Sequence, residues 1–233
     1  MRREPWLGQN AIKRLNTETV RRYARRLEER GPGAYALGWG KARYQTLRFQ
    51  AAARALEPGD LLGRSVLDVG CGLGDLYEFL AAAKLKPARY LGLDINASLL
   101  QMAAAKLPQC RFEGRDLLLN PFAAPVADTG LMLGVINFKL KRHQEYAREL
   151  IRRAFSAVRS TLLVNAISDV HNEDYPREPF IHYHKPAELL AFAQTLTPFC
   201  SLIQDYRARP QYEFMLILRK KPWSAQEAKH GRR

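Results

Sequence analysis

Apolar positions follow one spacing at the start of the chain and another from Ser65 onward. Residues 17–31 and residues 41–56 place apolar side chains every three or four positions, which predicts two helices. Thr17 is expected to cap the first helix, and Gly31 to end it. Both helices precede the first predicted strand, so they need not belong to its sheet.

From Ser65 the chain alternates between short apolar runs and amphipathic stretches. The apolar runs predict strands at residues 65–70, 89–95, 110–116, 129–138, 160–167, 199–207 and 212–220. The amphipathic stretches predict helices at about residues 75–85, 97–107, 143–158 and 185–196. This alternation predicts an α/β fold, a Rossmann-like seven-stranded and mostly parallel sheet with helices on both faces. The short ARPQ connection between the last two strands predicts an antiparallel hairpin at one edge.

These elements divide the chain of 233 residues into three parts. We expect an N-terminal helical extension over residues 1–60 and a core domain over residues 61–221. The remaining residues, 222–233, form a basic tail that we expect to be disordered. A chain of this length suits one α/β domain with a modest extension.

The net charge of +14 is concentrated at the two ends of the chain. Residues 1–60 hold 13 Lys and Arg against 6 Asp and Glu, and residues 219–233 hold 6 against 1. Basic ends of this kind can contact nucleic acid or another polyanion, but they are also typical of solvated helix faces. The charge alone therefore leaves both interpretations open.

The cysteines Cys71, Cys110 and Cys200 are scattered and odd in number. This pattern indicates a reducing compartment and speaks against a disulfide framework or a CxxC metal site. No apolar run is long enough to span a bilayer, and the first ten residues lack the apolar region of a signal peptide. We therefore expect a cytoplasmic protein, and we predict no metal site.

The stretch DVGCGLGD places three glycines, Gly70, Gly72 and Gly74, in the turn after the first predicted strand. Ligands of doubly wound sheets bind at such turns, and glycine lets a ligand approach the main chain. A dinucleotide site favours the wider spacing G-x-G-x-x-G, which accommodates a pyrophosphate. Asp68 precedes the turn and is expected either to hold an amino group or to order the loop.

Two further carboxylates end the next predicted strands. Asp94 follows Gly74 by twenty residues, at the position where a carboxylate accepts bonds from both ribose hydroxyls. Asp116 follows the third strand, and a carboxylate there can accept the exocyclic amine of an adenine. Leu117 lies beside it and is expected to flank the ring.

The order VLDVGCGLGDL, YLGLDIN and EGRDLL resembles the class I S-adenosylmethionine-dependent methyltransferases over residues 65–220. The resemblance implies S-adenosylmethionine as cofactor. It also implies that the glycine turn holds the methionine part, Asp94 the ribose and Asp116 the adenine. Ile95, next to the ribose acid, and Gly134, near the end of the fourth strand, complete the predicted cofactor contacts. The stretches LGWGKARYQTLRF and GVINF further resemble a group of bacterial methyltransferases.

The sequence lacks the motifs of some subclasses of this family. The GVINF stretch replaces the Asn/Asp-Pro-Pro-aromatic signature of DNA methyltransferases that act on exocyclic amines. No Pro-Cys pair is present for cytosine C5 chemistry, and no cysteine triplet is present for an iron–sulfur cluster. The family includes members whose N-terminal helices cover the cofactor, so residues 1–60 are a candidate lid.

Candidate groups for the acceptor side come from two later segments. His182 and His184 are the predicted catalytic bases, since an imidazole titrating near neutrality can take a proton from an acceptor. If the IHYHKP segment is extended, the two histidines lie on one side and Tyr183 on the other. His143 is expected to start a helix. Asn137 is expected either to bind the acceptor or cofactor or to cap that helix.

Aromatic residues before the core supply the other predicted pocket contacts. Tyr35 and Trp39 lie in the glycine-rich loop, and Tyr44 opens the second helix. Aromatic walls exclude water and hold a cation or a flat ring. Ordinary packing of the added helices explains the same residues equally well.

Three functions are compatible with these residues. The first is methyl transfer to an oxygen or nitrogen of a small-molecule acceptor. The second is methylation of RNA or protein bound through the basic ends, although no aromatic-basic RNA-binding module is present. The third is a non-catalytic protein that binds an adenosyl ligand. A binder of NAD remains a further alternative, disfavoured by the glycine spacing. The sequence predicts no membrane partner and leaves the oligomeric state open.

Overall fold

A computed structural model describes residues 8–170, 177–207 and 211–222. Its helices are α1 (Gln9–Arg30), α2 (Ala42–Ala55), α3 (Pro58–Leu61), α4 (Asp75–Ala82), α5 (Ala97–Lys106), α6 (His143–Ser156) and α7 (Pro186–Gln194). Its strands are β1 (Ser65–Val69), β2 (Arg89–Asp94), β3 (Arg111–Gly114), β4 (Ala127–Leu133), β5 (Val158–Ile167), β6 (Cys200–Ile203) and β7 (Glu213–Arg219). Apart from α3, every element was predicted from the hydrophobic pattern.

The strands form one sheet in the order β3-β2-β1-β4-β5-β7-β6. The first five strands run parallel, while β7 pairs antiparallel with both β5 and β6. The predicted seven-stranded sheet and its antiparallel edge are thus confirmed. All five residues of β1 are buried, which is typical of a central parallel strand covered on both faces.

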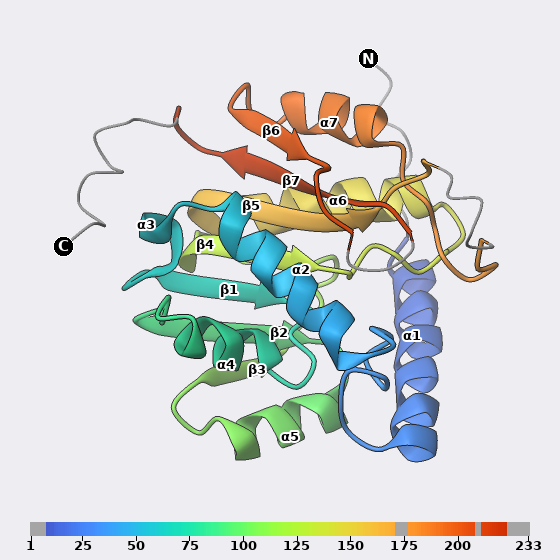
Figure 1. Cartoon of the computed structure of the whole chain (residues 1–233). Helices are drawn as coiled ribbons and strands as arrows, with labels where there is room; N and C mark the ends of the chain where they lie inside the picture. Colours follow the sequence, from blue (N-terminus) through green and yellow to red (C-terminus); the bar gives the residue numbers. More distant parts are fainter. Residues whose placement is uncertain (1–7, 171–176, 208–210, 223–233) are drawn as a thin grey trace.

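Helices cover both faces of the sheet. In Figure 1, α2, α4 and α5 lie in front of it, and α6 and α7 lie behind. The front core contains Phe49 of α2 and Leu80 of α4. The rear core contains Ile151 of α6 and Phe192 of α7. The helix α2 therefore packs directly on the sheet, although it comes from the predicted extension.

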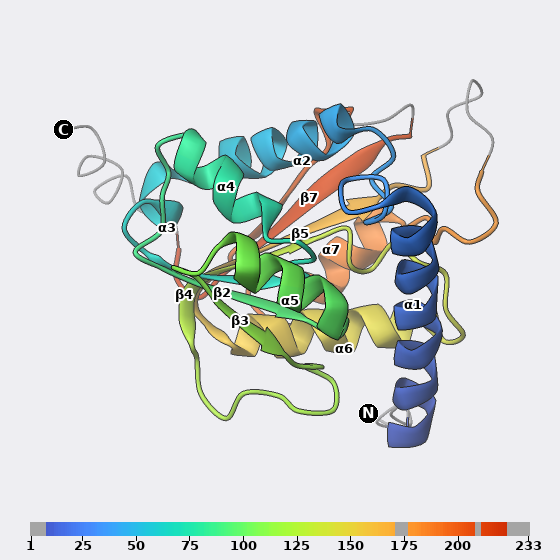
Figure 2. The same cartoon turned by 90° about the horizontal axis from the view of Figure 1, so that it is seen from below.

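Helix α1 lies across the carboxyl ends of the parallel strands, away from both helical layers (Figures 1 and 2). It starts eight residues before the predicted cap, so the prediction for Thr17 is wrong. The Thr17 hydroxyl donates instead to the carbonyl of Lys13, 2.9 Å away within the helix. Ile12 lies on the missed first turns and is completely buried. Gly31 ends the helix, as predicted, with a φ of 68°.

Strand β4 ends earlier than predicted. Gly134 follows it with a φ of 74°, a left-handed conformation that turns the chain out of the sheet. Residues 134–138 therefore form a loop at the carboxyl edge rather than the end of a strand. None of the described helices is both long and apolar enough to cross a membrane. The basic tail predicted for residues 222–233 lies outside the described residues except for its first position.

Candidate active site

Side chains from two other segments of the chain pack against the glycine turn after β1. Gly70 and Gly72 have φ values of 75° and 54°, which side chains of other residues rarely adopt. A Cβ at Gly70 would lie 2.6 Å from the Val135 side chain, and one at Gly72 would lie 2.9 Å from Leu37. The turn thus needs glycine at these positions for two reasons. Its dihedral angles are left-handed, and the side chains of Val135 and Leu37 pack directly against it.

The carboxylate of Asp94 is bonded to the same turn. One oxygen accepts the Gly72 amide at 3.0 Å, and the other accepts the Asn96 amide at 2.9 Å. Burial raises the pKa of Asp94, while these backbone donors counteract the rise. The glycine turn and the acid of β2, predicted separately, form one hydrogen-bonded unit.

Asp116 lies just beyond β3, and α1 reaches it. One of its oxygens accepts the Leu118 amide at 2.7 Å, and the other accepts the side-chain amide of Asn16 at 2.6 Å. Asn16 is 100 positions away in the chain, and sequence reasoning missed it because no local pattern marks such a partner. Helix α1 is therefore fastened to the predicted adenine site.

Asp68 is buried within β1 and accepts a hydrogen bond from the Tyr90 hydroxyl, 2.5 Å away. Burial raises the pKa of Asp68 to about 7, although the bond from Tyr90 lowers it. Asp68 therefore changes its charge near neutral pH. Its neighbour Cys71 is buried, and burial raises the pKa of its thiol far above the usual range, which makes it an inert packing residue.

A cavity opens over the carboxyl ends of the strands, beneath α1. Eight of the nine predicted cofactor contacts line it: Asp68, Gly70, Gly72, Asp94, Ile95, Asp116, Leu117 and Gly134. Gly74 does not line it, contrary to the prediction. A Cβ at Gly74 would lie 2.9 Å from Leu107, so this glycine serves the packing below the turn.

The remaining wall of the cavity is mainly apolar and aromatic. It includes Trp39, Phe138, Leu140, Phe180 and Ile181. Arg26 of α1 also lines this part of the cavity. Its guanidinium carbon lies 5.4 Å from the centre of the Phe138 ring.

The Arg26 guanidinium is incompletely paired. Its Nη1 atom is buried and has no hydrogen-bond partner among the residues that the structure describes. A buried donor without a partner is rare in folded proteins and calls for an explanation, such as a ligand.

Among the predicted pocket aromatics, only Trp39 lines the cavity. Tyr35 is 54% exposed and packs under the Arg30 guanidinium on the outer side of the loop. Tyr44 contacts Arg43, and the Tyr183 hydroxyl accepts the Glu178 amide. The prediction that Tyr35, Tyr44 and Tyr183 line the pocket is therefore wrong in this structure. Sequence spacing did not show which side of each loop faces inward.

Asn137 lines the cavity, but its side-chain oxygen is already engaged. It accepts the Ile167 amide at the end of β5, at 3.0 Å. Asn137 does not cap α6, which starts at His143 directly after Arg142. Its main role in this structure is to join the loop after β4 to β5.

His182 and His184 do not line the cavity, contrary to the expectation for catalytic bases. Their rings lie on one side of the segment, as the alternation predicted, with centroids 4.6 Å apart. They face His143 behind the wall formed by the loop after β4. Burial lowers the pKa of both imidazoles, to about 4 for His184. Neither ring is placed to take a proton from a group inside the cavity.

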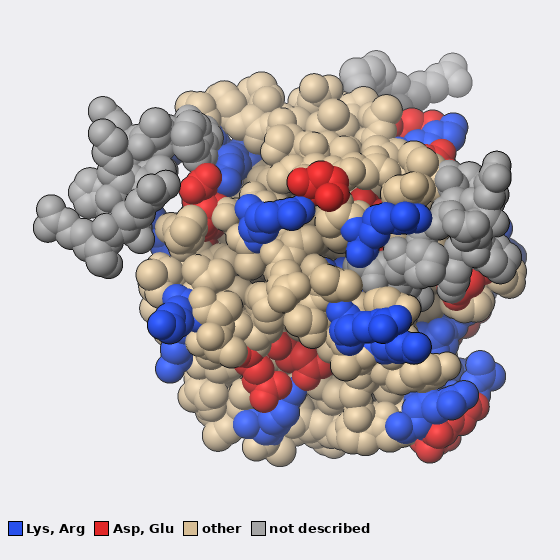
Figure 3. Space-filling model, in the orientation of Figure 1, with Lys and Arg blue, Asp and Glu red and all other residues tan. Residues whose placement is uncertain are grey.

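Charged side chains are dispersed over the face shown in Figure 3. Basic side chains there form separate groups, several of them beside acidic ones. Ion pairs of this kind include Lys106 of α5, which bridges Asp75 and Glu78 of α4 at 2.6 and 2.7 Å. The described residues on this face thus form no continuous basic track of the kind that binds a nucleic-acid backbone.

The sheet order, the glycine turn and the carboxylates ending successive strands define a class I S-adenosylmethionine-dependent methyltransferase. Residues 66–160 match the model of a family described as "Methyltransferase domain". A putative methyltransferase of Mycobacterium tuberculosis is 26% identical over 167 residues, which cover 67% of this chain and 93% of that protein. Trans-aconitate 2-methyltransferase of Methylobacterium nodulans is 38% identical over 95 residues, covering 37% of this chain and 35% of that protein.

Solved structures share the fold. Magnesium protoporphyrin IX methyltransferase of Synechocystis, with bound SAH (S-adenosylhomocysteine), has a TM-score of 0.62 and 20% identity, covering 90% of this chain and 97% of that one. A methyltransferase of Aquifex aeolicus has a TM-score of 0.54 and 15% identity, covering 76% and 92%. Fold, site and matched segment together place this chain among the class I methyltransferases.

Proposed function

We propose that this methyltransferase binds S-adenosylmethionine in the cavity and methylates an oxygen of a small molecule that carries a carboxylate. The observation behind the choice of acceptor is the buried, unpaired Nη1 of Arg26, whose side chain lines the cavity together with aromatic residues such as Trp39 and Phe138. A guanidinium matches the geometry of a carboxylate and binds it through two parallel hydrogen bonds.

The residues present fit the cofactor. Asp94 and Asp116 each use their oxygens for backbone and side-chain donors, yet each oxygen retains a second lone pair for a ribose hydroxyl or an adenine amine. Asp68 lies where the amino group of the methionine part is expected, beside the glycine turn. The cofactor supplies an activated methyl group, and the chain's residues supply position and exclude water.

A carboxylate acceptor needs no general base, so the Glu178 carboxylate that lines the cavity is not required to take a proton. A carboxylate oxygen carries no proton at neutral pH, so its lone pair forms the new bond to the methyl carbon directly. The bond from carbon to sulfur breaks at the same time, and its electrons return to the sulfur. Such an in-line displacement needs alignment and a water-poor site more than acid–base catalysis. Methyl transfer to a carboxylate therefore does not require His182 or His184 to line the cavity.

Two of the similar proteins act on small molecules according to their names. The relative from Methylobacterium nodulans is named for trans-aconitate, the anion of a carboxylic acid. The Synechocystis structure is named for magnesium protoporphyrin IX. These names support a small acceptor, and the dispersed charge in Figure 3 gives little support to a nucleic acid.

The proposal is tested with a cofactor labelled in its methyl group. The protein is incubated with this cofactor and a pool of small organic acids, and the products are then treated with mild alkali. A methyl ester hydrolyses to methanol, so we expect the label to become volatile. Label that stays non-volatile would show methylation of nitrogen or of an ether oxygen instead. Label in acid-insoluble material would show a macromolecular acceptor. If no label is transferred at all, the protein would be a non-catalytic binder of the cofactor.

Arg26→Ala tests the role of the guanidinium, and Arg25→Ala is the matched control. The Arg25 side chain is 73% exposed on the same helix and pairs with the exposed Glu29. We expect Arg26→Ala to raise the KM for the acid by at least about tenfold, the scale of a lost charge-assisted bond, and Arg25→Ala to change it little. Because SAH also carries a carboxylate, its affinity is compared with that of methylthioadenosine, which lacks one. If Arg26→Ala weakens SAH but not methylthioadenosine, Arg26 holds the cofactor and not the acceptor.

A further inference from the structure

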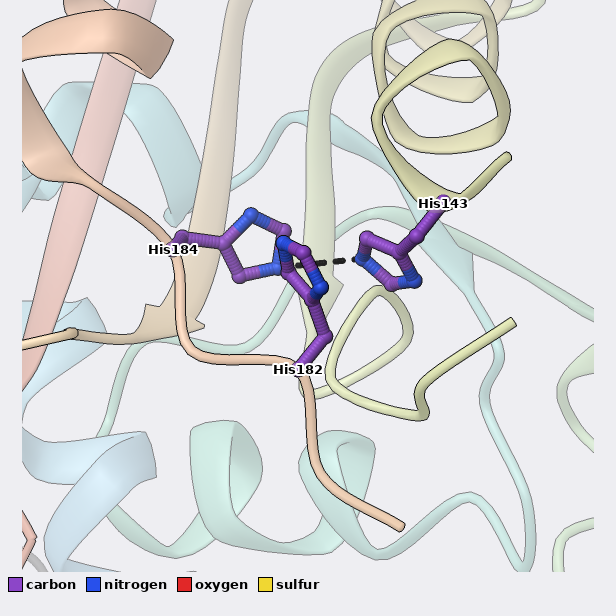
Figure 4. Close-up of side chains that lie close together, drawn as sticks. All are labelled: His143, His182 and His184. Carbon is purple, nitrogen blue, oxygen red and sulfur yellow. Dashed lines mark hydrogen bonds between the residues drawn. The ribbon is translucent and has the colours of Figure 1, made fainter. Parts of the chain in front are cut away.

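Three histidines come together outside the cavity. His143 starts α6, while His182 and His184 lie on the segment before α7 (Figure 4). The His143 and His182 rings stack at 3.7 Å, and the His143 and His184 rings lie 5.1 Å apart. One ring nitrogen from each of the three lies within 4.8 Å of the other two.

Burial favours the neutral form of the three imidazoles. Burial lowers the pKa of His143 to about 3 and that of His184 to about 4, and it also lowers that of His182. Each neutral ring carries one lone pair on nitrogen, which is the form of histidine that binds metals. The His184 Nε2 atom is an exception, because it donates to the Ile136 carbonyl, so its proton must first move to Nδ1.

Hydrogen bonds within the protein do not satisfy this group. The Nδ1 atom of His143 is buried without a partner among the described residues, and its Nε2 atom faces the Nε2 atom of His184 at 3.4 Å. The His184 Nε2 atom donates to the carbonyl of Ile136, at 2.8 Å. Buried polar atoms that remain unmatched are often explained by an unseen ion or water.

We propose that His143, His182 and His184 form a binding site for a divalent transition-metal ion of the zinc type. Zinc takes imidazole nitrogens at about 2.0–2.1 Å in tetrahedral geometry, which separates two such nitrogens by about 3.3–3.4 Å. The separation of 3.4 Å between the Nε2 atoms of His143 and His184 matches that value. Binding requires the His184 Nε2 atom to give up its bond to the Ile136 carbonyl. It also requires the stacked His143 and His182 rings to turn apart, because a metal ion lies in the plane of each imidazole that binds it.

The ion would join the start of α6, which carries His143, to the segment before α7, which carries His182 and His184. The segment before α7 in turn contacts the loop after β4, whose Asn137 lines the active-site cavity. The His182 amide already donates to the Asn137 carbonyl at 2.8 Å, and Phe138 pairs with Ile181. An ion on the three rings would add a stronger link at the same place, behind the chamber lined by Phe138 and Ile181. Its role is therefore to hold the wall, and the ion does not touch the reacting atoms.

A surface hollow gives the ion access to the site. His143 and His182 line this hollow together with Lys139, Arg142 and Glu145. Three cationic side chains of the hollow, those of Lys139, Arg142 and Arg148, disfavour a dication. Lys139 and Arg142 are exposed, where screening weakens their effect, and Arg142 also pairs with Glu145. The neutral imidazoles contribute no further charge.

Metal binding is measured on the full chain without an affinity tag, after treatment with a chelator. Cobalt is titrated first, because a tetrahedral cobalt ion absorbs visible light strongly, and zinc is then titrated by calorimetry. We expect one ion per chain and an increase of the melting temperature with zinc, since an ion that binds only the folded state stabilises it. If the wild-type protein binds no stoichiometric ion, the proposal is overturned. The three histidines would then interact only through hydrogen bonds and ring stacking.

His182→Ala is the diagnostic variant, because His182 is the least buried of the three and its loss should disturb folding least. Losing an outer partner of a metal ligand already costs about 10–100-fold in affinity, so losing a ligand should cost at least about tenfold. The control variant His171→Ala/His230→Ala removes the other two of the five histidines and should bind the ion like the wild type. Retained SAH binding by His182→Ala would show that it is folded. Equal metal affinity in His182→Ala, or its loss in the control, would place the ion elsewhere and refute the proposal.

Discussion

At the scale of single residues, Asp68 links the site to pH. It is 4% exposed in the central strand, and burial raises its pKa to about 7. Its folded-state pKa lies above the unfolded value, so the folded protein holds this proton more tightly. The contribution of Asp68 to stability is therefore present at low pH and is lost as the pH rises toward 7. Ligand binding should show the opposite trend, because a cationic amino group needs the ionised form.

We expect SAH to bind up to about tenfold more tightly at pH 8 than at pH 6. With a pKa of about 7, the ionised fraction of Asp68 rises from about one tenth to about nine tenths over that range. Calorimetric titrations at several pH values check this. Asp68→Asn keeps the shape of the side chain and should remove the pH dependence. The Tyr90 bond lowers the pKa of Asp68, so Tyr90→Phe should move the midpoint to higher pH. A pH dependence that survives in Asp68→Asn would assign it to another group.

At the scale of elements, α1 covers the cavity but is attached by few contacts. Among its described residues only Ile12 is buried. Asn16 donates to Asp116 in the first half of the helix, and the Tyr23 ring meets the Phe138 ring edge-on, 5.6 Å away, in the second half. A helix held this way can open locally at low cost. This arrangement supports the proposal that the start of the chain acts as a lid.

The Asn16–Asp116 bond should control this opening. We expect trypsin to cut α1 of Asn16→Ala several times faster than α1 of the wild type, because the bond of 2.6 Å that fastens the helix is lost. SAH should slow the cleavage in both proteins. Thr17→Ala is the control, since its hydroxyl bonds only within the helix. Equal cleavage rates in the wild type and Asn16→Ala would show that other contacts hold the helix, and no protection by SAH would argue against a lid.

Helix α2 is fixed to the sheet by a buried ion pair. The Arg48 guanidinium donates to Glu213 of β7, and both side chains are almost fully buried, at 2% and 0% exposure. The indole ring of Trp39 packs 4.8 Å from this guanidinium, so the pair also supports the loop over the cavity. Charged residues in the middle of α2 gave no sequence signal for this role, because a buried arginine and an exposed one look alike in a helical pattern.

Arg48→Met should lower the free energy of unfolding by about 3–5 kcal/mol, because it leaves the Glu213 carboxylate buried without its partner. Urea unfolding measures this loss. Arg54→Met on the same helix is the matched control. The Arg54–Asp205 pair is about 60% exposed on both sides, so its loss should cost no more than about 1 kcal/mol. Similar losses in the two variants would contradict the buried role of Arg48.

At the scale of the whole molecule, the sheet and the cofactor side could be predicted because their signals are local. The change from helical to strand spacing at Ser65 fixed the element order, and the turn from Gly70 to Gly74 marked the ligand end of β1. Asp94 and Asp116 follow from their positions at strand ends. Both line the cavity beside that turn.

The acceptor side could not be predicted in the same way, because loops form it. Tyr35 and Trp39 lie four residues apart in one glycine-rich loop, yet only Trp39 faces inward. His182 and His184 alternate as expected, but the side they share faces His143 instead of the cavity. Arg26 and Asn16 act through partners far away in the sequence, and only the packing of α1 brings them to the site.

The central claim is that an adenosyl ligand lies across the strand ends with its ribose held by Asp94. Calorimetric titration of SAH into the wild type, Asp94→Ala and the control Glu78→Gln tests it most directly. Glu78 is an exposed acid of α4 outside the cavity wall. We expect one SAH per wild-type chain and the same affinity in Glu78→Gln. Asp94→Ala should lose about 2 kcal/mol, about 30-fold in affinity, the scale of a hydrogen bond to a charged group. Unchanged affinity in Asp94→Ala, or no binding by the wild type, would contradict the account.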